Sequence, residues 1–321
     1  MKLHENKKLF SELIRSVAHR MEIAEIYVEK DYWVTLALYH IFQNDIKRET
    51  IFKGGTALAK CFNVIERFSE DIDLVMVRKE GEGNSKMERK VKRPGKTIEA
   101  ILPEVFVKEL TNKKGMIRKT AHTYEKYFDG KFGQVRDYIV LETTYLGRFE
   151  PFHDSQINSY IGKTLIEANQ QAITEEYNIL PFTVQVLHVK RTLCEKIMSL
   201  VRWSYGEGPI QQLKDKIRHT YDINQLLKVE EVNTFLESDE FFSMLESVKE
   251  DDLLSFKTDN EWLNYPLKDA LIFSQTEKVW SKLKPTYTNE FSRLVYGELP
   301  NESEIDNTIR RVAQRLETYK L

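Results

Sequence analysis

The fold of the chain is decided by Phe52-Lys-Gly-Gly-Thr-Ala-Leu58, followed by Arg67-Phe-Ser-Glu-Asp-Ile-Asp-Leu74. The second part leads into an apolar run rich in β-branched residues, which predicts a strand over residues 71–77. Side chains of a strand alternate between its faces, so Asp71 and Asp73 should project from the same side. Two carboxylates this close repel each other unless a cation lies between them, and oxygen ligands suit Mg²⁺. The pair therefore predicts a magnesium site, with a solvated strand edge as the alternative.

A glycine turn precedes this strand. Gly54, Gly55 and Thr56 lie between a strand candidate at residues 50–53 and a helix candidate at 56–63. Such a turn lets backbone N–H groups approach an anion at the start of a helix, although it can also be just a tight connection. A phosphate cradle beside a metal-binding carboxylate pair is the minimum apparatus for phosphoryl or nucleotidyl transfer.

At these residues the sequence resembles the AbiEii/AbiGii-type nucleotidyltransferases, toxin components of bacterial toxin–antitoxin and phage-defence systems. The likeness extends to Val28–Trp33, Thr192–Lys196, Arg202 and Arg218–Asp222, and so covers roughly residues 5–228. It implies a minimal nucleotidyltransferase fold, a nucleoside triphosphate substrate and two Mg²⁺ ions bound by Asp71 and Asp73. Within Val28–Trp33, Lys30 could serve a triphosphate, but helix packing is the favoured interpretation of this bulky segment.

The resemblance also implies roles for single residues. The expected phosphate contacts are Lys53, Gly54, Gly55, Thr56, Arg67, Ser69 and Arg218. Lys196 would neutralise charge as pyrophosphate leaves, and Asp222 would act as a catalytic or positioning residue. Several plain alternatives stay open: Arg67 could pair with Glu66 or Glu70, Lys196 could lie on the surface, and Arg218 and Asp222 could form an intrahelical ion pair. Thr192 and Glu195 match a capping box, which predicts that their helix begins near Thr192.

Glu142 is the candidate for a third metal ligand. It stands alone among the apolar residues of Ile139–Thr143, where a buried carboxylate is costly without a partner. A metal ion is one such partner, and a strand edge facing water is the other. The family has an acidic residue on a strand at about this place, which favours the metal site. Asp137 is the fallback.

A basic segment follows the aspartate strand. Residues 78–119 carry 13 Lys and Arg against 6 Asp and Glu, although the whole chain has a net charge of −2. Clusters of Lys and Arg attract phosphate backbones, whereas the alternative is a solvated helix face. Together with the resemblance to a toxin, the segment predicts RNA as the acceptor, in particular the 3′ end of tRNA. A cognate antitoxin is a further possible partner.

The order of expected elements predicts an α/β (α+β) protein with a mixed sheet and a C-terminal helical bundle. Helices are expected at 6–22 and 29–43, a further helix over Ile98–Phe106, strands at 115–127, 135–146 and 182–189, and helices thereafter. The expected domains are residues 1–190, a nucleotidyltransferase domain with N-terminal helices, and residues 191–321, a helical domain that contributes site residues. No apolar run is long enough for a membrane span and no signal peptide is expected, so we expect a cytoplasmic enzyme.

Other functions stay open on the sequence alone. The acceptor could be a small molecule or a protein, or the chain could be a nucleotide-binding regulator without turnover. Retention of Asp71, Asp73, Gly54 and Gly55 argues against the last possibility, because a decayed site loses such residues. The basic segment argues mildly for a nucleic acid over a small molecule.

Overall fold

The computed structural model describes residues 1–113, 116–129, 136–145, 149–255 and 260–319 of the chain. Its contacts group the chain into two units. The first comprises Met1–Asn63, Phe68–Tyr145 and Phe152–Leu187, and the second comprises Val64–Arg67, Leu146–Pro151 and His188–Leu321. Each unit is thus assembled from segments far apart in the sequence. The domain boundary expected near residue 190 stays a prediction, because such grouping does not establish that either part folds alone.

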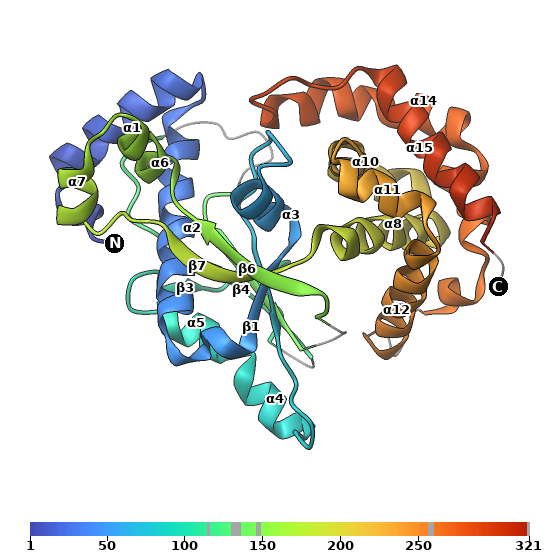
Figure 1. Cartoon of the computed structure of the whole chain (residues 1–321), viewed down its shortest axis with the longest axis horizontal. Coiled ribbons are helices and arrows are strands. Elements are labelled where there is room, and N and C mark those ends of the chain that lie inside the picture. Colours follow the sequence, from blue (N-terminus) through green and yellow to red (C-terminus); the bar gives the residue numbers. More distant parts are fainter. Residues whose placement is uncertain (114–115, 130–135, 146–148, 256–259, 320–321) are drawn as a thin grey trace. The chain divides into compact units, whose positions relative to one another are not determined.

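The first unit is built on a mixed sheet with strands in the order β3-β4-β5-β2-β1-β7-β6 (Figure 1). At its centre, β1 (Thr50–Lys53) pairs with β2 (Ile72–Met76) antiparallel and with β7 (Phe182–Leu187) parallel. Strand β2 in turn pairs with β5 (Ile139–Thr144) parallel. The outer strands, β3 (Glu104–Val105), β4 (Ile117–His122) and β6 (Phe152–Ile157), add antiparallel pairs. This arrangement confirms the expected mixed α/β fold.

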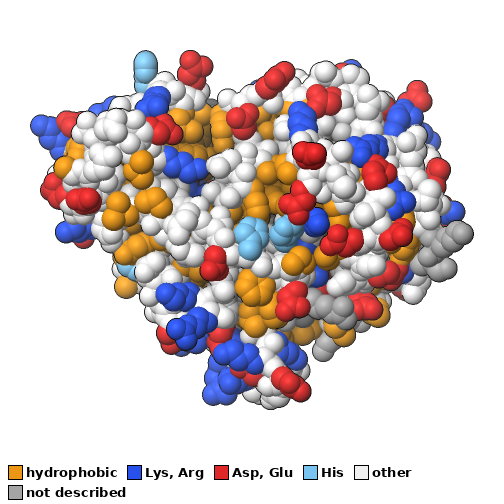
Figure 2. All heavy atoms as spheres, in the orientation of Figure 1, with side chains coloured by type: hydrophobic (Ala, Val, Ile, Leu, Met, Phe, Trp, Pro, Cys, Tyr) orange, Lys and Arg blue, Asp and Glu red, His pale blue; other side chains and the backbone are white. Residues whose placement is uncertain are grey.

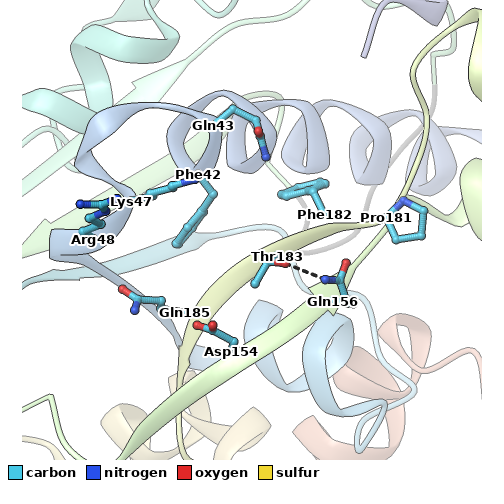
Figure 3. Close-up of a pocket in the computed structure, with 10 residues that line it drawn as sticks. All are labelled: Phe42, Gln43, Lys47, Arg48, Asp154, Gln156, Pro181, Phe182, Thr183 and Gln185. Atoms are coloured by element: carbon cyan, nitrogen blue, oxygen red, sulfur yellow. Dashed lines mark hydrogen bonds between the residues drawn. The ribbon is translucent and has the colours of Figure 1, made fainter.

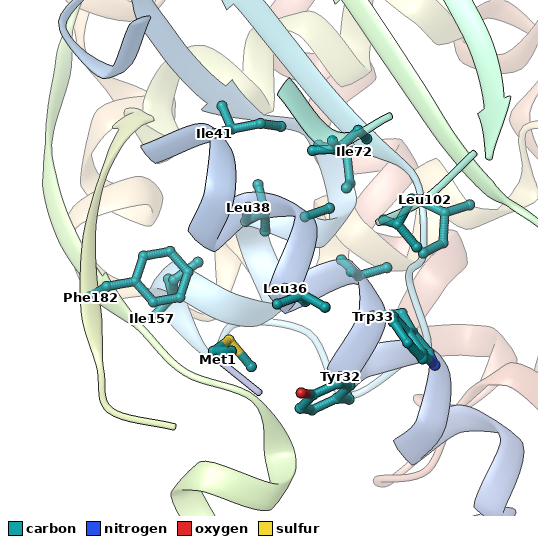
Figure 4. Close-up of a cluster of buried hydrophobic side chains, with 14 of the residues drawn as sticks. Met1, Tyr32, Trp33, Leu36, Leu38, Ile41, Ile72, Leu102, Ile157 and Phe182 are labelled. Carbon is teal, nitrogen blue, oxygen red and sulfur yellow. The ribbon is translucent and has the colours of Figure 1, made fainter. Parts of the chain in front are cut away.

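Helix α2 (Glu25–Gln43) lies at the centre of the first unit's core. It is buried on nearly every side, and its buried residues include Glu29, Lys30 and Asp31 as well as apolar side chains. Figure 4 shows Tyr32, Trp33, Leu36 and Ile41 of this helix packed among side chains from the sheet, including Ile72. The core therefore fixes β2, the strand that carries Asp73, against α2.

Shorter helices surround this core. Helices α1 (Lys7–Met21), α6 (Tyr160–Glu167) and α7 (Gln171–Glu176) gather beside α2 in Figure 1. The 3₁₀ helix η2 (Asp45–Glu49) leads from α2 into β1, and α3 (Gly54–Ala57) with the π-helical turn η3 (Leu58–Phe62) follows β1. Helices α4 (Asn84–Lys90) and α5 (Arg93–Ile98) come after β2.

The second unit is helical where the structure describes it. It contains α8 (Val189–Tyr205), α9 (Pro209–Asp215), α10 (Ile217–Leu227), α11 (Glu230–Glu237), α12 (Asp239–Ser255), α13 (Leu271–Ser274), α14 (Thr276–Pro285) and α15 (Glu302–Glu317) (Figure 1). The expectation of C-terminal helices is therefore confirmed. Within the described residues, no helix is both long enough and apolar enough to span a bilayer.

Several expected elements differ from the observed ones. The helix expected over Ile98–Phe106 is wrong, because α5 ends at Ile98 and Glu104–Val105 forms β3. Pro103 explains the difference, since proline lacks an N–H donor and disfavours helical geometry at the residue before it. The strands expected at 115–127 and 135–146 are shorter, and residues 115, 135 and 146 lie outside the described part of the chain. Strand β6 was not expected at all.

The expected start of α8 is also wrong. The helix begins at Val189, and the side chain of its N-cap residue His188 accepts a hydrogen bond from the Lys190 amide. Thr192 therefore lies inside the helix, where its hydroxyl donates to the His188 carbonyl over 3.3 Å. The Thr-x-x-Glu pattern is therefore not a capping box in this helix. The Thr192 hydroxyl instead bonds a carbonyl four residues earlier, as threonine can do inside a helix.

Candidate active site

Gly54 brings the end of β1 very close to the aspartate strand. Antiparallel pairing sets Lys53 opposite Asp73, and Gly54 follows with a backbone φ of +80°. A Cβ atom at this position would lie 2.2 Å from Asp73 Oδ2, which no real structure tolerates. Glycine is required here for its positive φ and for the space that it leaves to the carboxylate.

Thr56 shapes the loop that precedes the aspartate strand. Its buried hydroxyl donates to the Asp71 carbonyl over 2.6 Å and lies 3.0 Å from the Ser69 hydroxyl. The structure thus brings Thr56, Ser69 and Asp71 together. In this arrangement the Thr56 hydroxyl holds the backbone of Asp71 in place, a role that the sequence did not suggest.

Three carboxylates meet at neighbouring strands of the first unit. Parallel pairing of β2 and β5 sets Glu142 directly beside Asp73, and Asp71 immediately precedes β2. Burial, then the charges of Glu142 and Asp71, raise the pKa of Asp73 to about 7. The side chains of Asp71 and Glu142 are 31% and 33% exposed, so both are accessible to an incoming ligand. The three carboxylates repel one another at this point, and a bound cation would relieve that repulsion.

Two basic side chains already contact these carboxylates. Lys119 of β4 lies 3.0 Å from Glu142, and the Arg136 guanidinium lies 3.1 Å and 3.2 Å from the two oxygens of Asp71. Burial would lower the pKa of Lys119, but Glu142 and the two aspartates raise it overall. Among the described residues, no group of three or more His, Cys, Asp or Glu side chains is arranged to hold a metal ion. The hard oxygen donors suit Mg²⁺, yet Lys119 and Arg136 would have to yield to it.

Arg136 is itself held by a buried ion pair. Its backbone N–H donates to Glu70 over 3.0 Å, and its carbonyl accepts a hydrogen bond from Lys30, which also donates to Glu70. Lys30 has no exposed surface, so the packing interpretation of this residue is correct. A lone arginine before a strand carries no sequence signal, and neither Arg136 nor Lys119 was anticipated as a neighbour of the aspartates.

A second cluster lies in the second unit, around the fully buried Asp222 of α10. Arg67 binds it through two hydrogen bonds, Nε to Oδ1 and Nη2 to Oδ2, each 2.7 Å long. Lys196 of α8 donates to Oδ2 over 2.6 Å. Burial alone would raise the pKa of Asp222, but Arg67 and Lys196 outweigh it and hold that pKa well below its usual range. His219 lies on the same helix, and its Nδ1 atom is buried without a hydrogen-bond partner among the described residues.

This cluster corrects three alternatives. Lys196 is buried and is not a surface residue, and Arg67 pairs with Asp222 in place of Glu66 or Glu70. The carboxylate of Asp222 is engaged by Arg67 and Lys196, which come from other segments, so its main partners are not intrahelical. Arg218, which the sequence offered as the intrahelical partner of Asp222, is half-buried on α10. The structure thus places Asp71, Asp73 and Glu142 in the first unit and Arg67, Lys196, Arg218 and Asp222 in the second.

Ion pairs within the fold take up part of the positive charge of residues 78–119. Lys90 is buried and donates to Glu82 over 2.5 Å, while Arg93 binds Asp45 over 2.7 Å. These two residues therefore stabilise the fold and are poor candidates for RNA contacts. Figure 2 shows Lys and Arg side chains gathered over α4, and the exposed residues of α4 and α5 and the link between them include Arg89, Lys92 and Lys96.

A glycine turn packed against clustered carboxylates on a mixed sheet is the arrangement of a nucleotidyltransferase, and comparison with known families gives the same class. The model of the family described as "Nucleotidyl transferase AbiEii toxin, Type IV TA system" matches residues 36–312. The chain therefore belongs to the AbiEii family of nucleotidyl transferase toxins of type IV toxin–antitoxin systems, which confirms the expected resemblance.

A solved structure gives a weaker comparison. MenT4, nucleotidyltransferase toxin Rv2826c from Mycobacterium tuberculosis H37Rv, is 17% identical, with a TM-score of 0.44 over 92% of this chain and 97% of that chain. At this level of similarity it supports no conclusion about site or substrate. No curated protein matches the chain.

Proposed function

We propose that this enzyme transfers a nucleoside monophosphate from a nucleoside triphosphate to RNA, with the 3′ end of tRNA as the acceptor. The observation that carries the proposal is the alignment of Asp73 with Glu142 on paired strands, with Asp71 and Gly54 beside them. In the reaction, the acceptor hydroxyl oxygen bonds to the α-phosphorus, the bond to the β-phosphate oxygen breaks, and pyrophosphate leaves.

The carboxylates would hold two Mg²⁺ ions, which supply charge neutralisation for the triphosphate and a lowered pKa for the acceptor hydroxyl. The oxygen donors are of the kind that Mg²⁺ prefers, and a cation would relieve the repulsion among Asp71, Asp73 and Glu142 once Lys119 and Arg136 move aside. Glu142 would accept the proton of the acceptor hydroxyl. Arg136 would give up Asp71 and turn to the triphosphate, where a guanidinium matches phosphate geometry.

The remaining expected residues keep proposed roles. Lys53, Gly54, Gly55, Thr56 and Ser69 would position the phosphates of the nucleotide. Lys196, Arg67 and Arg218 would neutralise phosphate charge, and Asp222 would hold Arg67 and Lys196 in place. We also propose that a cognate antitoxin restrains the enzyme, since the family belongs to toxin–antitoxin systems. Its substrates would place its action in the cytoplasm.

The test is a transfer assay with purified protein, Mg²⁺, deacylated tRNA and each α-labelled nucleoside triphosphate in turn. We expect label at the tRNA 3′ terminus with at least one nucleotide, and a loss of at least about 1,000-fold in Asp73→Asn, since a metal ligand is removed. The matched control is Asp129→Asn, because Asp129 is exposed and belongs to the same unit. Label found only on protein or on a small molecule would overturn the RNA acceptor, and an active Asp73→Asn would overturn the metal site.

Acceptor binding can be tested separately in the same assay. Charge reversal of Arg89, Lys92 and Lys96 should weaken tRNA binding and flatten its dependence on salt, because phosphate contacts release counterions. The Kd for nucleotide should not change. The matched control reverses three exposed lysines elsewhere, Lys8, Lys278 and Lys282. Equal losses in both triple variants would mean that the basic segment has no special part in binding.

A further inference from the structure

A pocket of about 480 Å³ lies in the first unit, away from the carboxylates (Figure 3). It is bounded by the end of α2 and by η2 on one side and by β6 and β7 on the other. Strand β1 runs from η2 at Thr50 to Lys53, which pairs with Asp73. Strand β1 lies between β7 and β2 in the sheet, so at about 4.8 Å per strand the backbones of Gln185 and Asp73 are about 10 Å apart across it, and no carboxylate of the cluster lines the pocket. The pocket is therefore a separate site.

Its lining combines apolar walls with one unsatisfied acceptor. The ring of Phe42 comes from α2 and the ring of Phe182 from β7, and Figure 3 shows Gln185 of β7 across from Phe42. The Gln185 Oε1 atom is buried and has no hydrogen-bond partner among the described residues. A buried acceptor without a partner costs about 1–3 kcal/mol, so such atoms in native proteins call for a ligand or bound solvent. Asp154, beside Gln185 in the same view, adds an exposed acceptor.

Two cations stand together at one end of the pocket. Lys47 and Arg48 of η2 are exposed, and the described residues include no ion-pair partner for either. The ion pair between Arg93 of α5 and Asp45 of η2, 2.7 Å long, joins this end of the pocket to the basic surface of α4 and α5. The contact brings η2 next to α5, and Lys47 and Arg48 supply the positive charge at the pocket mouth.

We propose that this pocket binds one nucleotide unit, apart from the reacting triphosphate. Lys47 and Arg48 would bind its phosphate, since unpaired Lys and Arg side chains are the usual partners of phosphate groups. Gln185 and Asp154 would accept hydrogen bonds from an exocyclic amino group of the base. Two acceptors favour bases that carry such a group, so cytosine should bind better than uracil, which has the same size. The nucleotide is either free in solution or part of an RNA strand.

Photo-crosslinking of the full chain tests the site directly. Without Mg²⁺ and with EDTA, the probes are free 8-azidoadenosine monophosphate and an RNA oligonucleotide that carries 8-azidoadenosine, with crosslinked peptides mapped by mass spectrometry. We expect crosslinks within residues 42–48 or 181–185, competed by CMP at least tenfold better than by UMP. A crosslink with the free probe would identify a free nucleotide as the ligand, and a crosslink with the oligonucleotide alone would identify an RNA residue.

Matched variants define what would overturn the proposal. Lys47→Glu with Arg48→Glu, and separately Gln185→Leu, should lower crosslinking at least tenfold, whereas Lys2→Glu with Lys8→Glu, an equal change of charge on the same unit, should not. Crosslinks only elsewhere, no crosslinks at all, or equal loss in both double variants would overturn it. Crosslinking does not depend on catalysis, so it tests the pocket independently of the transfer reaction. We therefore expect Asp73→Asn protein to crosslink as wild-type protein does.

Discussion

At the scale of single residues, Gly54 determines how closely the two central strands approach at the carboxylates. We expect Gly54→Ala to lower nucleotidyl transfer by at least about 100-fold, because the added Cβ must displace Asp73 and the residue must leave its positive φ. The measurement is kcat for the transfer reaction together with circular dichroism. Gly81→Ala is the matched control, since Gly81 also has a positive φ but nothing lies within 4 Å of its Cβ position. Equal activity in the two variants would show that the contact with Asp73 does not matter.

Glu29 predicts a pH dependence of stability. Its buried carboxylate accepts hydrogen bonds from the Tyr127 and Phe128 amides, and burial raises its pKa to about 7 despite these bonds. Between about pH 4.5 and 7 the unfolded chain loses this proton while the folded chain keeps it, so the free energy of unfolding falls as pH rises. Through Glu29 the free energy of unfolding falls by about 3 kcal/mol at most, and this loss is complete above about pH 7.

Glu29→Gln should therefore flatten the dependence of stability on pH in this window. Urea unfolding at pH 5, 6, 7 and 8 measures it, and the slope is compared with that of wild-type protein. Exposed Glu22, for which the structure gives no hydrogen bond through the side chain, supplies the control Glu22→Gln. If Glu29→Gln keeps the full wild-type slope, other groups cause the pH dependence.

At the scale of elements, α8 and α10 are tied by Lys196, Asp222 and the incoming Arg67. Asp222→Ala would leave two buried cations without their carboxylate, and should lower the free energy of unfolding by roughly 3–5 kcal/mol. Lys196→Met keeps the paired hydrogen bonds between Arg67 and Asp222 and should cost much less. If Lys196 also neutralises phosphate charge, the Lys196→Met protein should lose nucleotidyl transfer activity while its stability changes little. Wild-type kinetics in a stable Lys196→Met protein would make the lysine purely structural.

The same elements mark the limit of what the sequence predicted. The aspartate strand was predictable because Ile72, Leu74, Val75 and Met76 form an apolar run interrupted only by Asp73, which is typical of a strand with apolar residues on both faces. The partners of Asp222 were not predictable, because Arg67 lies 155 residues away and no local spacing encodes such a contact. Arg136 and Lys119 were missed for the same reason. Strand β6 was missed because its exposed polar residues resemble a loop.

At the scale of the whole molecule, neither unit is a continuous piece of chain. Residues 64–67 belong to the second unit, where Arg67 forms a β-bridge with Val295 and the Tyr296 amide donates to the Glu66 carbonyl. A fragment of residues 188–321 would lose these contacts as well as the Arg67 charge beside Asp222. We expect it to unfold at lower urea concentration than the same helices in the full chain, as measured by hydrogen exchange of α8 and α10.

Coexpression with residues 1–187 should restore protection in α8 and α10, because that fragment supplies Arg67 and Glu66. Full protection in the isolated fragment would instead show that the boundary near residue 190 separates two independent domains.

The bridge between Arg67 and Val295 also has a consequence for protein synthesis. Ribosomes add about 5–20 residues per second, so Val295 follows Arg67 after roughly 10 to 50 s. Throughout that interval Arg67 lacks its β-bridge, and until residue 222 has been added it lacks Asp222 as well, so the second unit remains unfinished on the nascent chain. A toxin built in this way cannot complete its second unit before residue 295 has been translated, which delays the completion of its fold during synthesis.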